Sequence, residues 1–257
     1  MAPANSVTPC ARNLASALYL SMKILQIPRS RTAGMLLLQL FAASGHVYWI
    51  AGITTREKLA RFAPKIVASF PVLRDAPGRA YDRKHHRASV HLVVIPLEAN
   101  TAYWALVSTH GKGGFADSHA PNLGVVRDMR LKGQHLAFLH YELLYQEKRL
   151  PGVTGSTWTW RITPARYQEL EAQIVQVVRE RGSGAVTDLI AINSAMPLFS
   201  GVRGQVMKLN TEARKLALKR SNVVLPPTQL PYLRRQRIYD QVPLTLQEWL
   251  TTAPGGA

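Results

Sequence analysis

The sequence predicts an α+β protein built on an antiparallel sheet, and three observations support this fold class. Hydrophobic residues make up 47% of the 257 residues and charged residues only 18%, which indicates a packed core and excludes a disordered basic tail. Short runs of β-forming residues follow one another at hairpin spacing. The predicted elements have the order β-α-β-β, β-β, α-α, unlike the strict alternation of a doubly wound parallel sheet.

The first half of the chain contains the predicted β-α-β-β core. Its expected elements are helices over 10–26 and 33–43, a strand over 46–54, a helix over 55–70, a basic loop over 75–87, strands over 89–97 and 103–110, and a glycine-rich loop over 111–124. Thr54 or Thr55 is the expected cap of the third helix. The short polar link at 98–101 predicts that the last two strands form a hairpin.

The second half adds a smaller group of strands and then helices. Further strands are expected near 134–146 and 156–162, with a turn over 150–155 between them. Thr163 and Pro164 predict a helix start, and Gly182 its end. A last helix is expected over 202–220, followed by a basic arm rich in proline and arginine.

These patterns divide the chain into three predicted segments. Residues 1–43 form a basic helical segment without acidic residues, 44–182 the α+β core domain, and 183–257 the basic helix and C-terminal arm. The single cysteine, Cys10, excludes a disulfide scaffold and every multi-cysteine metal site.

Charge is the strongest indication of function. The chain has 32 Lys and Arg against 15 Asp and Glu, a formal net charge of +17. This excess is larger than solubility requires, and it favours a polyanionic partner, above all DNA or RNA. Each phosphate that a basic side chain neutralises releases counterions, so such clusters bind without base contacts.

Two basic clusters are the main binding candidates. The segment 79–87 holds four Lys or Arg and two His around the single Asp82, with Tyr81 available to stack on a base. In the 202–220 helix, apolar residues at steps of four and three predict one buried face and leave the basic side chains outside. The residues expected to contact nucleic acid are Arg79, Arg83, Lys84, Arg87, Lys112, Arg161, Arg203, Lys208, Arg214, Lys215, Lys219, Arg220, Arg234, Arg235 and Arg237.

Two other segments have competing interpretations. Trp158 and Trp160 face the same side of a strand and favour the core over a base-stacking platform, with Arg161 pointing the other way. Residues 32–55 carry no charge, but their apolar run is short, which favours a buried helix over a membrane span or a targeting segment.

An enzyme is the alternative to a binding protein. A metal-independent, RNA-processing nuclease on a ferredoxin-like core would share the β-α-β-β order and use His85, His86, His110 or His119 with basic support. The glycine-rich stretch around Lys112 is not a Walker A loop, and the sequence has no His-Glu-x-x-His, Gly-x-Ser-x-Gly or kinase motif.

The sequence therefore predicts a nucleic-acid-binding accessory subunit of a nucleoprotein complex, which contacts phosphates and other protein subunits. We expect no cofactor and no metal. A cytoplasmic location is expected, with organellar targeting by the N-terminal segment left open, and a basic membrane-associated protein is the third alternative.

Overall fold

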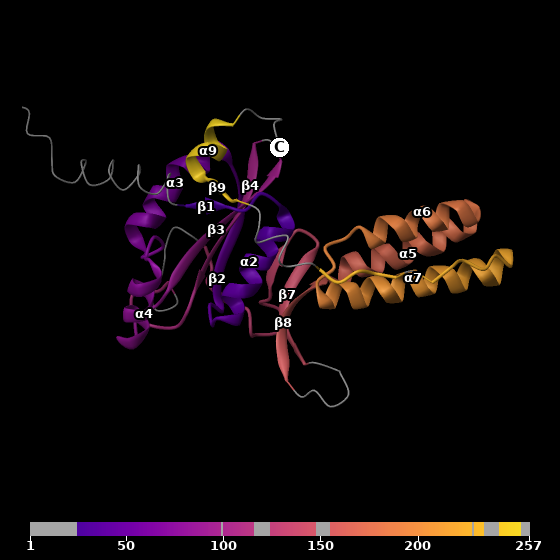
Figure 1. Ribbon diagram of the computed structural model, residues 1–257, viewed down its shortest axis with the longest axis horizontal. Coiled ribbons are helices and arrows are strands. Elements are labelled where there is room, and N and C mark those ends of the chain that lie inside the picture. Colours follow the sequence, from indigo (N-terminus) through magenta and orange to yellow (C-terminus); the bar gives the residue numbers. More distant parts are fainter. Residues whose placement is uncertain are drawn as a thin grey trace, which may run out of the picture. The chain divides into compact units, whose positions relative to one another are not determined.

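The computed structural model describes residues 25–98, 100–115, 124–147, 155–227, 229–233 and 242–252. Within these ranges helices combine with antiparallel sheets, which confirms the predicted α+β class (Figure 1). The chain divides into two compact units, one of residues 1–129 with 237–257 and the other of residues 130–236. The second unit is thus an insertion in the first, and the predicted core segment 44–182 contributes to both.

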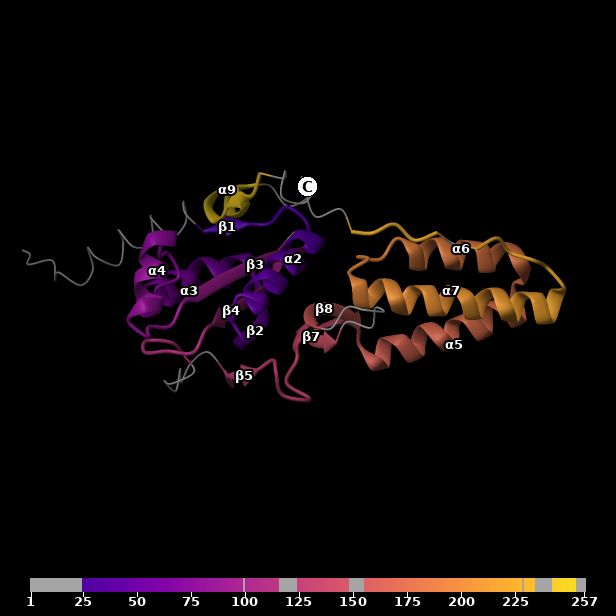
Figure 2. The ribbon, with the colours of Figure 1, turned by 60° about the horizontal axis from the view of Figure 1, so that its bottom comes forward.

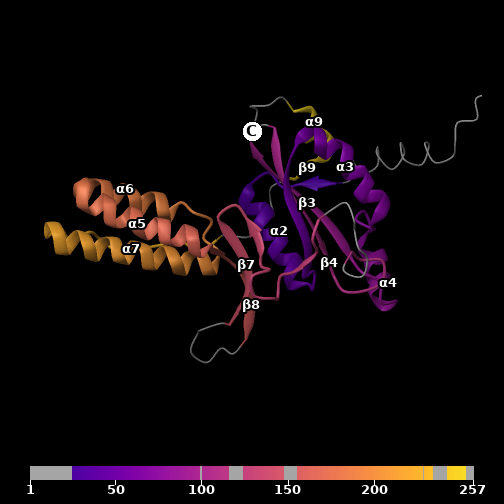
Figure 3. The ribbon, with the colours of Figure 1, turned by 180° about the vertical axis from the view of Figure 1, so that it is seen from behind.

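The first unit contains a four-stranded antiparallel sheet. The elements of this unit are β1 (Gln26–Ile27), α2 (Arg31–Ala43), β2 (Tyr48–Thr55), α3 (Arg56–Ser69), α4 (Ala76–Lys84), β3 (Val90–Glu98), β4 (Thr101–Ser108), β5 (Arg127–Asp128), β9 (Leu244–Thr245) and α9 (Leu246–Thr251). The strand order is β3-β4-β2-β5, with β4 antiparallel to both neighbours. The neighbouring strands β3 and β4 are labelled in Figure 3. The predicted hairpin of 89–97 and 103–110 is therefore confirmed, and β4 separates β2 from β3 as in a split β-α-β unit.

Helices cover both faces of this sheet. On one face, Leu92 and Val94 of β3 belong to a buried cluster that includes Leu59 and Ile66 of α3. On the other, α2 packs so closely on β3 that a Cβ at Gly34 would lie 2.4 Å from the side chain of Ile95. Since alternate residues of a strand face opposite sides, burial on both faces explains why β3 is apolar almost throughout.

The charge-free segment of residues 32–55 forms a core helix and a strand, as expected. Met35, Leu36 and Leu38 of α2 are buried. Ser30 begins this helix by accepting a hydrogen bond from the Ala33 N–H. Among the helices that the structure describes, we find none with the length and hydropathy of a membrane-spanning segment.

Two predictions in this unit are wrong. The segment 75–87 is not a loop throughout, because Asp75 caps α4 by accepting a hydrogen bond from the Gly78 N–H, and Pro77 sits in its first turn. The predicted helix 10–26 lies mainly outside the described residues, but its last residue, Gln26, belongs to β1 and pairs with Thr245 of β9. The pairing partner is more than 200 residues away, so local periodicity could not reveal it.

The second unit joins a three-stranded sheet to three helices. Its elements are β6 (Leu136–Phe138), β7 (Tyr141–Glu147), β8 (Ser156–Ile162), α5 (Pro164–Glu180), α6 (Gly182–Ser194) and α7 (Ser200–Ser221). The predicted strand 134–146 is in fact a hairpin of β6 and β7, which turns at Leu139 with a φ of 53°. The helices α5, α6 and α7 run side by side (Figure 2).

The beginning of α7 packs against the edge of β8. The side-chain amide of Gln205 accepts a hydrogen bond from the Ile162 N–H at 2.7 Å and donates one to the Ile162 carbonyl at 3.1 Å. Gly201 lies against the Trp160 carbonyl. Gln205 thereby supplies the hydrogen bonds that a further strand would make at Ile162. It shields this edge of β8, whose free backbone groups could otherwise pair with a strand of another molecule.

We predict opposite effects of two alanine substitutions in α7. A Cβ at Gly201 would lie 2.4 Å from the Trp160 backbone oxygen, so Gly201→Ala should lower the free energy of unfolding by about 1–3 kcal/mol. A Cβ at Gly204 meets nothing within 4 Å, so Gly204→Ala should raise it by up to about 1 kcal/mol. Urea unfolding measures both, and equal stability of the two variants would contradict the close approach of α7 to β8.

Candidate nucleic-acid interface

The last turn of α4 and the residues after it form an exposed basic surface. Arg83 and Lys84 lie in the final turn, and His85, His86 and Arg87 follow, all of them exposed. Cations at a helix C-terminus are favoured by the helix dipole, so this placement costs the fold little. His86 has a φ of 54°, which ends the helix and reverses the chain toward β3.

The glycine-rich loop after β4 is joined to this surface. The Lys112 N–H donates to the His86 carbonyl, and the Ala88 N–H donates to the Lys112 carbonyl, both at 3.0 Å. Gly111 makes this approach possible, because it has a φ of 136° and a Cβ there would lie 2.7 Å from the Ala88 nitrogen. The structure thus brings the exposed Lys112 beside Arg87, a juxtaposition that the sequence alone did not predict.

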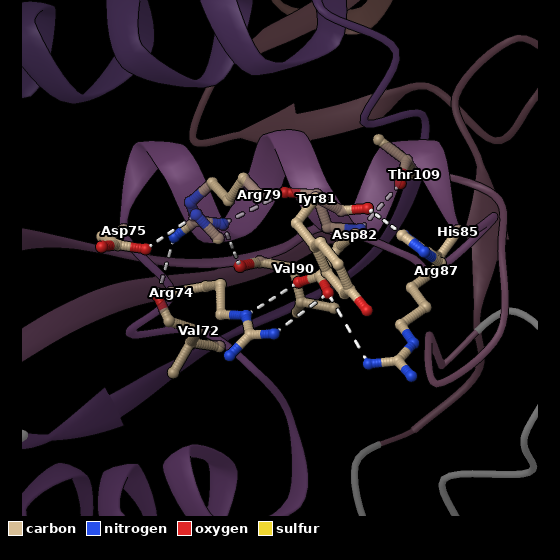
Figure 4. A network of polar contacts seen from close by, with 12 residues as sticks. Val72, Arg74, Asp75, Arg79, Tyr81, Asp82, His85, Arg87, Val90 and Thr109 are labelled. Carbon is tan, nitrogen blue, oxygen red and sulfur yellow. Dashed lines mark hydrogen bonds and ion pairs between the residues drawn. The ribbon is translucent and has the colours of Figure 1, made fainter.

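The single acidic residue of the segment 79–87, Asp82, is paired with an arginine that precedes the segment. Arg74 donates to both oxygens of the Asp82 carboxylate, at 2.9 and 3.2 Å, while Arg87 approaches it to 3.9 Å (Figure 4). The hydrogen bonds from Arg74 hold the pKa of Asp82 below its ordinary value, so this carboxylate stays ionised. Its side chain is only 5% exposed, so it presents little negative charge at the surface.

Arg79 belongs to the same segment, but its side chain forms hydrogen bonds inside the protein. Its guanidinium donates to the hydroxyl of Ser89 and to the carbonyls of Val90 and Val72, at 3.0–3.1 Å (Figure 4). Burial lowers the pKa of Arg79 below its ordinary value. With its donors used inside, Arg79 is a weaker candidate for a phosphate contact than Arg83, Lys84, Arg87 or Lys112.

The candidate catalytic histidines occupy different environments. The His85 ring stacks on Tyr81, with centroids 3.9 Å apart, and its Nδ1 lies 2.9 Å from the Tyr81 carbonyl oxygen. His86 and His110 are exposed, and the hydrogen bond from Lys112 places their segments side by side. His119 lies outside the described residues. Within those residues, no three His, Cys, Asp or Glu side chains are grouped as metal ligands would be.

The basic residues of α7 separate into two groups. Arg203 donates to the Leu230 carbonyl, Arg214 to the Pro226 carbonyl and Arg220 to the Arg179 carbonyl. These arginines hold neighbouring segments against the helix. The lysines are exposed, and no acidic side chain in the described part of the chain forms an ion pair with them; they are Lys208, Lys215 and Lys219.

The remaining predicted contacts are less available. Arg161 forms an ion pair with Glu142 at 2.5 Å, and Glu142 also lies 3.4 Å from His135. Trp158 and Trp160 are buried, which confirms that this pair belongs to the core. Arg234, Arg235 and Arg237 lie outside the described residues.

Sequence reasoning missed two features of this site. Arg74, which binds Asp82, precedes the basic segment, and nothing in its local pattern identified it. The Tyr81–His85 stack follows from a spacing of four residues on a helix, and the sequence shows this only once α4 is recognised.

Comparison with known proteins does not assign the site. No protein-family model matches the chain, and no match is found among characterised proteins or solved structures. Its function must therefore be argued from the geometry.

Two neighbouring histidines, the buried His46 and the partly buried His91, make stability sensitive to acid. His91 stacks on Phe41 with centroids 3.8 Å apart and meets the His46 ring edge-on at 4.7 Å. Burial lowers the pKa of His46 to about 4 and that of His91 to about 3, from an ordinary value of 6.5. The folded protein therefore keeps both rings neutral at pH values where the unfolded chain takes up protons.

We predict that stability falls as the pH is lowered from about 7 to about 5. The unfolded chain binds more protons in this window, so each histidine should reduce the free energy of unfolding by roughly 1–2 kcal/mol. Urea unfolding at several pH values measures this. His91→Phe keeps an aromatic ring on Phe41 but cannot titrate. The free energy of unfolding of this variant should therefore depend less on pH than that of the wild-type protein. A wild-type stability that does not change over this range would contradict the prediction.

Proposed function

We propose that this protein binds nucleic acid through the phosphate backbone, with its primary contact at the C-terminal end of α4. The observation that carries the proposal is the gathering of Arg83, Lys84, Arg87 and Lys112 on one exposed surface while Arg74 holds the acid of that helix, Asp82. From here on we call these four basic residues the α4 cluster.

The physical argument rests on charge that the fold does not use. A cation with an internal partner gains little from a phosphate, because it must first give up that partner. Arg83, Lys84 and Lys112 have no ion pair within the described ranges, and Arg87 has only the distant contact with Asp82. These side chains are free to replace the counterions of a polyanion, which favours binding most strongly at low salt.

The lysines of α7 are the second candidate contact. Lys208, Lys215 and Lys219 are seven and four residues apart, which places them within about 40° of one another around the helix. Glu212 is exposed on the same flank and reduces the net charge of this stripe. We therefore assign the α7 lysines a supporting role.

We predict that reversing the charge of the α4 cluster weakens binding. Arg83, Lys84 and Lys112, changed together to Glu, should lower the affinity for a mixed-sequence oligonucleotide at least about tenfold at low salt. The dependence of affinity on salt should become shallower by about one unit of slope for each phosphate that the variant no longer neutralises. Changing Lys208, Lys215 and Lys219 to Glu should weaken binding less, and equally for all sequences. Fluorescence anisotropy over a salt series measures both quantities.

The matched control changes three other exposed lysines, Lys58, Lys65 and Lys132, to Glu. This variant has the same net charge as the other two, so it corrects for long-range attraction. If all three variants bound with the same reduced affinity, binding would depend on total charge and the α4 cluster would have no special role. The same mixtures on a denaturing gel test the nuclease alternative, which requires shortened strands.

A further inference from the structure

We propose that the α4 cluster takes single-stranded nucleic acid and that one base stacks on the Tyr81–His85 pair. This inference rests on the proposed function and specifies its ligand. Tyr81 is 50% exposed although it lies among charged side chains, and His85 is exposed beside it. Single-strand binding requires a fixed aromatic surface next to cations that are available to phosphates, and this end of α4 places the two together.

The aromatic pair is held in place before any ligand arrives. The two rings are nearly parallel, at 26°, with centroids 3.9 Å apart. The contact between His85 Nδ1 and the Tyr81 carbonyl oxygen, at 2.9 Å, fixes the imidazole at the C-cap of α4, next to the Tyr81 ring. A base that stacks on this pair does not have to order a mobile side chain, so less binding energy is lost to entropy.

The cations lie where the backbone of a stacked nucleotide would pass. Lys84 and His85 are three and four residues after Tyr81, so they share its face of α4. Arg87 follows directly after the helix, and the backbone hydrogen bonds of Lys112 hold that residue beside it. The phosphates on either side of a stacked base are therefore within reach of flexible cationic side chains.

The cost of freeing a base favours a single strand over a duplex, and burial limits which rings can serve as its platform. A base can lie flat on an aromatic ring only if it leaves its own stack, which costs a duplex base pairing and costs a single strand little. The large aromatic rings that are buried, Trp49, Trp158, Trp160 and Trp249, cannot serve as platforms. Tyr145 and Tyr232 are also exposed, but both belong to the second unit, whereas Tyr81 lies on the helix that carries Arg83 and Lys84 of the α4 cluster.

The test compares three labelled probes with equal numbers of phosphates per strand. They are an oligothymidine, a strand of the same length in which abasic sites replace the bases, and a thymidine–adenine duplex. We expect the wild-type protein to bind the oligothymidine about 5- to 50-fold more tightly than the abasic strand, and more tightly than the duplex. Tyr81→Ala should remove this preference and leave the affinity for the abasic strand unchanged.

Tyr81→Phe is the matched variant, because it keeps the ring and its stacking surface and should retain the preference. Thermal unfolding of both variants checks that the fold is intact. If intact and abasic strands bound equally well, or if Tyr81→Ala kept the full preference, the stacking inference would be overturned and phosphate binding would stand. If the wild-type protein bound none of the three probes at low salt, the proposed function itself would fail.

Discussion

The ion pair between Arg74 and Asp82 is the interaction on which the candidate site depends. Asp82 is the only acidic residue within α4, and its buried carboxylate must be paired to remain charged. Arg74 pairs with it through two hydrogen bonds, which fixes α4 to the segment before it. That attachment removes the one negative charge of this helix from the surface and orients the end of α4 toward the glycine-rich loop. The α4 cluster therefore depends on a residue that is not part of it.

Many arginines of this protein bind its own backbone, whereas the lysines that the structure describes are exposed. Arg56, Arg79, Arg203, Arg214 and Arg220 all donate to backbone carbonyls far along the chain or at the ends of helices. The planar guanidinium suits this, since several donors leave it in fixed directions. Lysines offer a compact charge on a flexible stem and remain at the surface. The net charge of +17 consequently overstates the charge that is available to a partner.

Most of the fold followed from local patterns. The strands at 46–54, 89–97, 103–110 and 156–162 and the helices at 33–43, 55–70 and 202–220 all occur, because alternation, caps and apolar spacing act over a few residues. The failures have specific causes. The basic composition of α4 is typical of a loop, although Asp75 and Pro77 favour a helix start there. The first turn of α6 contains glycines and has no recognisable start signal. The strands β1 and β9 are two residues each and exist only through their mutual pairing.

For the candidate site, the sequence by itself determined the charge, the absence of recognisable catalytic motifs and the two basic segments around 79–87 and 202–220. Only the tertiary structure decided which cations are available, because availability depends on partners that lie far apart in the sequence. Arg79 and Arg203 were predicted phosphate contacts. In the folded protein Arg79 donates to the carbonyls of Val72 and Val90, and Arg203 donates to the carbonyl of Leu230. Lys112 joined Arg87 only through backbone hydrogen bonds between two loops. Composition sets how much charge a protein has, and packing sets how much of it remains for a ligand.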